Sequence, residues 1–509
     1  MEGSEPRLDK YDVVVVGAGL GGLSTGACLA RAGKRVLVVE RQDGPGGNAH
    51  AFQRGAYTFD PAIHVTAHGF NIEFLDFYLA ALGISDRMEL VRAEECFGVD
   101  IEGARFTLPI GVEVLIEHLG DLFPAEKDGL ARFIETCAQA TRESQAPPPR
   151  VALKDLEEVM KALPTLFKYR TATLADVLDE FLDDPQAKAV CAAQWPYLGL
   201  PPSRMAFMAY SGAFMATVEP GPIYPKGGFQ HLSDSLADVI RENGGELVLD
   251  TTVTGISLEG ETVSGVVLDS GQEVGAGVVV SNVDAKQTFE ELVGAEHLPE
   301  RFMRRLGRMK PSLSAFLVYS AATLDPRDFG MRHETFVYRH WDHDTTYSEI
   351  LEGGLGGMWL SFPTLHDPSL APEGEHIVLF TSLMPYDIGE PWDGAKERYT
   401  EAMLEQVEAV MPGYRDATTF VDSATPATFE RYTRAQQGAA YGWENTPSQT
   451  VPKRLDYRTP IEGLFLAGHW THPGTGSVRC LLSGAQTAAA ITGQHDPIAL
   501  LGSLSGSST

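Results

Sequence analysis

A glycine-rich turn between an apolar strand and a small-residue helix constrains the fold most strongly. Residues 11–16 (YDVVVV) form a short β-branched run that is typical of a buried parallel strand, and the turn GAGLGG at 17–22 follows at once. Residues 20–32 predict a helix that ends near Gly33, and residues 35–40 predict a second buried strand. Together they predict a βαβ unit.

Each glycine of this turn has a mechanical reason. Gly17 permits the tight turn out of the strand, Gly19 lets a pyrophosphate approach the backbone, and Gly22 lets the helix pack close to the sheet. The pyrophosphate would lie on the positive helix N-terminus at Leu20. Glu40 ends the second strand, where an acidic side chain accepts hydrogen bonds from ribose hydroxyls. The set predicts a bound dinucleotide, and a glycine turn without a nucleotide is the alternative.

The same fingerprint serves NAD and FAD, and two further motifs favour FAD. Residues 41–47 read R-x-x-x-x-G-G, with Asn48 next, which resembles the FAD-binding signature of the amine oxidase and phytoene desaturase superfamily. Near the other end, the strand predicted at 463–467 leads into Gly468 and then into a small-residue helix at about 476–491. This resembles the superfamily's second flavin motif, in which a positive helix N-terminus faces the flavin pyrimidine ring.

Four other segments narrow the resemblance to the bacterial phytoene desaturase, carotenoid isomerase and retinol saturase branch. They are FDPAIH at 59–64, YPKGG at 224–228, VSNVD at 280–284 and THPG at 471–474. The resemblance spans nearly the whole chain. It implies FAD as the cofactor, bound by Gly17, Gly19, Leu20, Gly22, Glu40, Arg41, Gly47, Asn48, Val253, Gly468, His469, Ser477 and Val478.

The resemblance also implies that Val253 meets the adenine through its backbone. Two positions depart from the family pattern. His469 stands where the family usually has an acidic residue, and Arg479 stands where relatives often have a small one. Both departures affect the contacts that we expect around the flavin.

We expect an α/β protein with a glutathione-reductase-like, FAD-binding Rossmann domain and an interleaved α+β substrate domain. The FAD-binding domain would comprise residues 1–100, 220–300 and 441–498, and the substrate domain residues 101–219 and 301–440. Residues 71–181 are expected to be mainly helical, interrupted by an exposed linker at 146–149, and residues 499–509 to form a flexible tail.

His64 is the candidate catalytic residue. In the resembled family this stretch runs near the reactive face of the flavin, where an imidazole could donate or accept a proton beside the N5 atom. A hydrogen-bonded structural histidine is the alternative, and we favour that structural role for His68.

We predict no metal site. The H-x-x-H of His469 and His472 has no third ligand nearby in sequence. The cluster HWDHD at 340–344 lies between irregular polar segments, which favours a solvated loop. The five cysteines are far apart and form no C-x-x-C pair, which favours reduced thiols in the cytoplasm.

Charge and hydropathy limit the partners. The net charge of −29 repels nucleic acid and anionic lipid, so we expect no nucleic-acid partner and only apolar, peripheral contact with a membrane. No signal peptide or long uninterrupted apolar run is present. Residues 189–218 are rich in Met and aromatic residues and are broken by prolines. They suit a tunnel for an apolar substrate or a membrane-contacting surface, with ordinary core as the alternative.

These observations predict an FAD-dependent oxidoreductase that acts on C–C or C=C bonds of an apolar polyene or isoprenoid substrate. Desaturation, saturation and cis/trans isomerisation through reduced flavin remain open. One dinucleotide fingerprint is visible, so the flavin would exchange electrons with the substrate and with an outside donor or acceptor. The alternatives are a flavin amine oxidase-like enzyme and a non-catalytic prenyl carrier of the Rab escort and GDI type. The complete glycine set and Glu40 disfavour the carrier.

Overall fold

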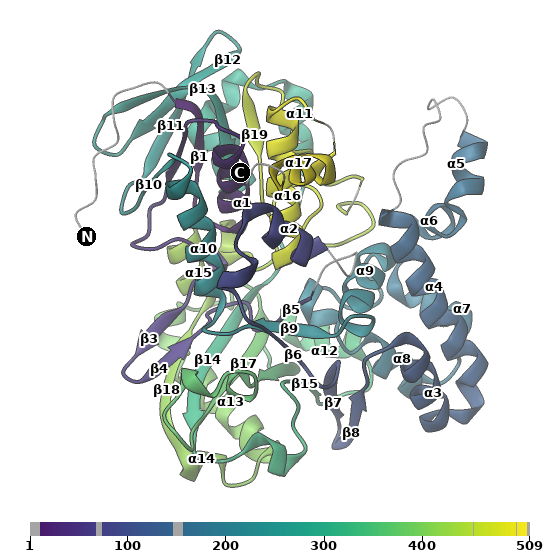
Figure 1. Cartoon of the computed structure of the whole chain (residues 1–509). Helices are drawn as coiled ribbons and strands as arrows, with labels where there is room; N and C mark the ends of the chain where they lie inside the picture. The colour runs from purple at the N-terminus through teal and green to yellow at the C-terminus, as the bar shows by residue number, and fades with distance from the viewer. Residues whose placement is uncertain (1–10, 68–73, 146–155, 451, 495, 506–509) are drawn as a thin grey trace.

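Two seven-stranded sheets organise the chain, one above the other in Figure 1, with a group of helices beside them. The computed structural model describes residues 11–67, 74–145, 156–450, 452–494 and 496–505. His68, the linker predicted at 146–149 and residues 506–509 lie outside these ranges. The fold class predicted from the sequence is confirmed.

The first sheet carries the predicted dinucleotide-binding unit. Its central strand β1 pairs in parallel with β2 on one side and with β13 on the other, and β13 also pairs in parallel with β19 from near the end of the chain. Strands β12 and β11 continue the sheet antiparallel. The bounds are β1 Tyr11–Val16, β2 Val36–Val39, β10 Glu246–Val248, β11 Val253–Glu259, β12 Thr262–Leu268, β13 Glu273–Ser281 and β19 Leu464–Leu466.

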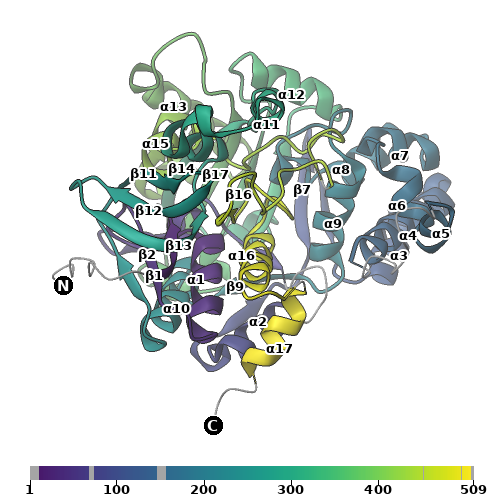
Figure 2. The ribbon, with the colours of Figure 1, turned by 90° about the horizontal axis from the view of Figure 1, so that it is seen from above.

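Helices α1 (Leu20–Arg31) and α16 (Ser477–Ile491) lie side by side against this sheet, as Figure 2 shows. Their small residues permit a close approach. A Cβ on Gly484 would lie 2.5 Å from the Gly21 carbonyl oxygen, so only glycine fits there. The Ser24 hydroxyl of α1 donates to the Leu481 carbonyl of α16 at 2.7 Å. Segments about 450 residues apart in sequence thus form one structural unit.

The second sheet has the strand order β18-β14-β17-β16-β15-β7-β8 and is antiparallel except for the β15–β7 pair. Its bounds are β7 Phe97–Ile101, β8 Ala104–Leu108, β14 Ser314–Ala322, β15 Glu334–Tyr338, β16 Gly357–Ser361, β17 His376–Met384 and β18 Thr418–Ala424.

The prediction that residues 71–181 are mainly helical was wrong for residues 90–108. This stretch contains β6 (Leu90–Arg92), β7 and β8. All five residues of β7 are buried, because β7 pairs with β15, more than 230 residues later in the chain. A partner so distant leaves no signal in the local sequence.

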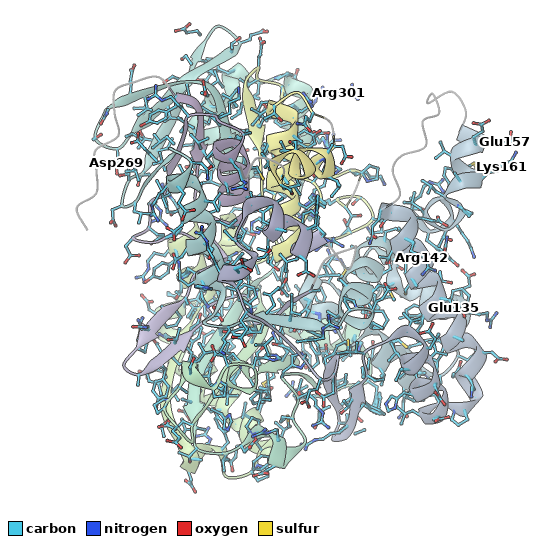
Figure 3. All side chains as sticks on the ribbon, in the orientation of Figure 1. Glu135, Arg142, Glu157, Lys161, Asp269 and Arg301 are labelled. Carbon is cyan, nitrogen blue, oxygen red and sulfur yellow. The ribbon has the colours of Figure 1, made fainter. Side chains whose placement is uncertain are left out.

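A helical region lies beside the second sheet, on the right of Figure 1. The helices are α3 Val112–Leu122, α4 Lys127–Gln145, α5 Leu156–Ala162, α6 Pro164–Tyr169, α7 Leu174–Phe181, α8 Pro185–Ala192 and α9 Phe207–Val218. In Figure 3, Glu135, Arg142, Glu157 and Lys161 project outward from α4 and α5. No helix within the described ranges is long and apolar enough to cross a membrane.

Most of the apolar segment 189–218 belongs to the core of this helical region. Buried side chains of the segment are Trp195, Leu198, Met205, Phe207, Phe214 and Met215. Tyr197 and Met208 are only half-buried. The core alternative therefore accounts for most of the segment. Of these eight side chains, only Tyr197 and Met208 keep the accessible surface that a tunnel lining requires.

The remaining elements connect the two sheets and cover their edges. A small sheet of order β5-β9-β6 joins the loop that carries His64 to the chain that precedes α10. The bounds are β3 Phe52–Arg54, β4 Tyr57–Phe59, β5 Thr66–Ala67, β9 Pro222–Pro225, α2 Phe74–Leu82, α10 Phe229–Glu242, α11 Glu300–Leu306, α12 His343–Leu351, α13 Trp392–Val410, α14 Tyr414–Ala417, α15 Pro426–Thr433 and α17 Pro497–Ser505.

The expectation of a flexible tail at 499–509 was wrong for residues 499–505, which lie in α17. Leu500, Leu501 and Leu504 are at most 3% exposed, and the helix packs against α2 and α16. The spacing of these leucines places them on one face of a helix. The abundant Gly and Ser around them masked that pattern.

We predict that Leu501→Ala lowers stability by about 2–5 kcal/mol, because it leaves a cavity in the interface of α17 with the body of the protein. Ile498→Ala on the same helix is the matched control, since Ile498 is 47% exposed. The urea midpoints of the two variants provide the test. Equal midpoints for wild type and both variants would mean that α17 contributes nothing to the fold.

Candidate active site

The first glycine turn admits no larger residues. Gly17 has a φ of +93°, which L side chains rarely adopt. A Cβ on Gly19 would lie 2.7 Å from Nδ2 of Asn282, and a Cβ on Gly21 would lie 2.5 Å from the backbone nitrogen of Gly468. The turn is therefore packed against two segments from distant parts of the chain. Because its glycines have no side chains, the backbone of the turn itself is open to a ligand.

Helices α1 and α16 both begin without a side-chain cap. Their N-cap residues are Gly19 and Gly476, and neither first turn contains an acidic residue. The first N–H groups of a helix have no intrahelical partner, and the helix dipole makes that end positive. Both ends, which include the predicted residues Leu20, Ser477 and Val478, therefore suit a negatively charged ligand such as a pyrophosphate or a reduced flavin.

Glu40 lies at the first glycine turn as predicted. One carboxylate oxygen accepts from the Ala18 N–H at 2.7 Å, and the other accepts from the Gln42 N–H at 2.9 Å. The Glu40 backbone also pairs with residues 248 and 251, which brings the start of β11, with Val253, to the same end of the sheet. The residues predicted to contact the ribose and the adenine thus lie in neighbouring segments, and the contacts themselves stay predictions.

The segment with Gly47 and Asn48 lies against the same turn. The Gly46 N–H donates to the Ala18 carbonyl at 2.8 Å, and a Cβ on Gly47 would lie 3.1 Å from the Cα of Gly19. The Arg41 guanidinium does not contact this turn. It donates to the carbonyls at 431 and 432, at the end of α15. The structure therefore does not bring this guanidinium to the turn, and its contact with FAD stays a prediction.

Asn282 is a site residue that sequence reasoning missed. Its side chain lies among Gly17, Gly19, Gly21 and Gly468, and a Cβ on any of these glycines would come within 4 Å of it. The amide therefore fills the space that four glycines leave between the two flavin motifs. The segment 280–284 carried the family resemblance, but nothing in its local pattern indicated this contact.

Arg454 organises the loop that carries His469. Its guanidinium is buried and donates from Nε and Nη2 to the His469 carbonyl at 3.1 and 2.9 Å, and from Nη2 to the Tyr441 carbonyl at 3.1 Å. Burial, followed by repulsion from Arg479, lowers the pKa of Arg454 to about 9, so the group stays cationic at neutral pH.

The His469 ring is neutral. Burial, followed by the Arg454 charge, lowers its pKa to about 4 although the side chain keeps accessible surface. Burial also lowers the pKa of half-buried Arg479 to about 10. Arg454 and Arg479 give the region near the start of α16 positive charge.

The loop that carries His64 is fixed at both ends. The Asp60 carboxylate accepts from the Tyr224 hydroxyl at 2.5 Å and from the Phe229 N–H at 2.9 Å, which ties the loop to the N-terminus of α10. On the other side, the hydroxyls of Thr66 and Ser477 are 2.5 Å apart. His64 is thereby held close to the first residue of α16.

His64 itself is a neutral, buried imidazole. Its side chain is 7% exposed, and burial lowers its pKa to about 3. Nδ1 is 2.9 Å from the Ser361 hydroxyl, whereas Nε2 is buried and has no hydrogen-bond partner in the described part of the chain. An unpaired nitrogen in such a place is available to a ligand or substrate.

The other histidine groups have structural partners. His472 Nε2 lies 3.2 Å from the Arg454 carbonyl. His343 Nε2 lies 2.9 Å from the Ala189 carbonyl, and Asp342 caps the N-terminus of α12. Across the described ranges, no group of three or more His, Cys, Asp or Glu side chains could hold a metal ion.

Comparison with known proteins identifies the family. Residues 20–492 match the model of the flavin containing amine oxidoreductases, a span that begins within the first glycine turn and includes His64 and the second flavin motif. The chain belongs to this family. It is an FAD-dependent oxidoreductase, and the glycine cradles at α1 and α16 fit that cofactor.

Several curated relatives are similar over most of their length. Prolycopene isomerase 2 from an Oncidium hybrid cultivar is 28% identical, with 96% of this chain and 84% of the relative covered. The neurosporene-forming phytoene desaturase of Rhodobacter capsulatus is 26% identical, with coverage of 95% and 94%. All-trans-retinol 13,14-reductase of Macaca fascicularis is 25% identical, with coverage of 90% and 82%.

Solved structures share the fold. Putrescine oxidase bound to putrescine superposes with a TM-score of 0.65 at 15% identity, with 96% of this chain and 100% of that chain covered. Rab GDI from Plasmodium falciparum superposes with a TM-score of 0.54 at 11% identity, with coverage of 96% and 100%. The fold alone therefore does not separate the enzymes from the carrier, and the residues of the site must do so.

We predict that Glu40→Gln weakens FAD binding, because the ribose loses a charge-assisted hydrogen bond worth about 1.5–3 kcal/mol. This corresponds to a Kd that rises roughly 10- to 150-fold. Quenching of flavin fluorescence during reconstitution of the apoprotein measures it. Asp43→Asn is the matched control, since Asp43 is exposed three residues away. An unchanged Kd for Glu40→Gln would remove Glu40 from the site.

Proposed function

We propose that this oxidoreductase acts on C–C or C=C bonds of an apolar polyene or isoprenoid. The main support comes from the relatives, whose names describe an isomerase of prolycopene, a desaturase of phytoene and a reductase of all-trans-retinol. FAD supplies storage of two electrons and passes a hydride to or from carbon when bound. The chain's own residues bind, orient and move protons around it.

The electrostatics of the site suit this chemistry. The capless N-terminus of α16 and the cations of Arg454 and Arg479 favour negative charge in their neighbourhood, as a two-electron-reduced flavin would carry. His64 and His469 are neutral, so an apolar substrate meets no charged imidazole. A hydrocarbon gains about 0.8 kcal/mol for each methylene that it buries, and binding therefore requires no ionic anchor.

His64 is the residue proposed to exchange a proton with the substrate. In saturation, Nε2–H would donate a proton to the carbon next to the one that receives the hydride. In desaturation, unprotonated Nε2 would accept the proton. The buried and unpartnered Nε2, on a loop tied to Ser477, supports this role.

We also propose that the protein contacts a membrane peripherally and that it exchanges electrons with a separate donor or acceptor. Large apolar side chains are exposed on the helical region, with Val114 54% exposed and Leu122 41% exposed on α3, and Met160 41% exposed on α5. Exposed apolar side chains such as these would be the points of contact with the bilayer that dissolves a polyene. The charge of −29 makes such contact independent of anionic lipid.

We predict that the holoenzyme converts polyenes and leaves amines untouched. Oxidised and chemically reduced holoenzyme are incubated anaerobically with phytoene-like, lycopene-like and retinol-like polyenes and with putrescine, and flavin absorbance and product mass are followed. A polyene that gains or loses two hydrogens, or isomerises, supports the proposal. Bleaching of the oxidised flavin by putrescine alone would favour the amine oxidase alternative, and a protein that does not take up FAD would favour the carrier.

A further inference from the structure

A chain of four polar side chains leads from His64 into the second sheet. The members are Tyr197 on the turn between α8 and α9, Glu334 at the start of β15, Ser361 at the end of β16, and His64. The Tyr197 hydroxyl donates to Oε2 of Glu334 at 2.7 Å, and Ser361 Oγ is 2.9 Å from Nδ1 of His64. The chain ends at the unpartnered Nε2 of His64.

Ser361 and Glu334 are direct neighbours across the sheet. They pair in the antiparallel register of β15 and β16, and side chains opposite each other on one face have Cβ atoms about 4.5–5.5 Å apart. The hydroxyl that contacts His64 therefore belongs to the residue directly opposite Glu334. Oε1 of Glu334 has no hydrogen-bond partner among the described residues, so it can pair with this hydroxyl after a rotation of either side chain.

Glu334 is held as a neutral acid. It is 1% exposed, and burial raises its pKa to about 8, although the hydroxyls of Ser361 and Tyr197 oppose the shift. A carboxyl group with this pKa carries its proton at neutral pH. No cation of the described chain contributes to the shift, so no ion pair explains why an acid is buried here.

The surroundings of the chain are apolar. The ring of Tyr197 packs edge-on against Phe336 at 5.0 Å and against Trp359 at 5.9 Å. The titratable groups that face Tyr197 are Glu334, Tyr441 and Cys96, and burial raises the pKa of both Tyr441 and Cys96. The proton of Glu334 is thus the most acidic one in the cluster.

We propose that Glu334 is the proton reservoir for His64 and that Ser361 relays its proton. The inference rests on the proposed function of the site. In the direction of saturation, Glu334 O–H passes a proton to Ser361 Oγ, the Ser361 hydroxyl passes its own proton to His64 Nδ1, and His64 Nε2–H passes its proton to the substrate carbon. Tyr197 donates to the carboxylate that remains.

The step balances in atoms and charge. One O–H bond of Glu334 breaks and one C–H bond of the substrate forms, while Ser361 and His64 end with the number of protons that they had at the start. The two electrons of the other new C–H bond come as a hydride from a reduced flavin. Desaturation runs the same chain in reverse, into a Glu334 carboxylate. The imidazolium form of His64, which burial disfavours, never arises.

The relay explains why a buried acid and a neutral histidine occur together. A neutral imidazole is a weak acid when it acts alone, because it would leave an imidazolate. Concerted delivery to Nδ1 removes that obstacle, and the charge that develops resides on Glu334, where Tyr197 is already oriented to stabilise it.

The first test uses the FAD-loaded protein without substrate. We expect its infrared spectrum at pH 7 to contain the carbonyl band of a buried protonated carboxyl group, which Glu334→Gln removes and Ser361→Ala and Tyr197→Phe shift. Ser382→Ala and Tyr210→Phe are the matched controls. Both residues are buried in the same region and hydrogen-bond to carbonyls outside the chain of four, so the band should not move. Absence of a Glu334 band in the wild type would overturn the proposal.

The second test follows the proton during turnover of a polyene in heavy water. Glu334→Gln and Ser361→Ala should lower kcat about 10²- to 10⁴-fold, the contribution typical of a general acid, with KM and bound FAD unchanged. The solvent isotope effect on kcat should rise as proton delivery becomes limiting. Wild-type kcat in Glu334→Gln would overturn the relay while the proposed function stands. A wild type inactive on polyenes that still shows the Glu334 band would refute the proposed function and leave the proton store in place.

Discussion

The site depends on a contact that only glycines allow. Gly21 of α1 meets the backbone of Gly468, and Gly484 of α16 meets the backbone of Gly21, with the Asn282 amide between the turns. A single Cβ at these positions would separate the two flavin motifs. Because the helices touch here, segments from both ends of the chain lie together where we propose that one FAD binds.

Charge is distributed differently outside and inside this protein. The chain as a whole is strongly acidic, with a net charge of −29, whereas the region near the start of α16 has the cations of Arg454 and Arg479 and neutral imidazoles at His64 and His469. If FAD binds here as we propose, this positive charge would favour its reduced form, and the neutral imidazoles would suit a hydrocarbon substrate. In the proposed relay the proton comes from Glu334, a buried carboxyl group whose raised pKa keeps it neutral.

The sequence predicted the parts of this structure that local rules determine. The β1 strand, the glycine turn, α1 and the position of Glu40 follow from spacing, and α16 follows from its resemblance to a known motif. It did not predict β7, whose partner β15 is distant, or α17, whose leucines are hidden among Gly and Ser. It also missed Asn282, Arg454 and Glu334, because their roles arise from contacts between segments far apart in sequence.

A crystal structure of the FAD-loaded protein tests the central claim most directly. The account predicts the pyrophosphate on the N-terminus of α1, a ribose hydroxyl on Glu40, and the flavin ring between the N-terminus of α16 and Nε2 of His64. A flavin ring without contact to α16, or with His64 turned away from it, would contradict the account even if FAD were bound.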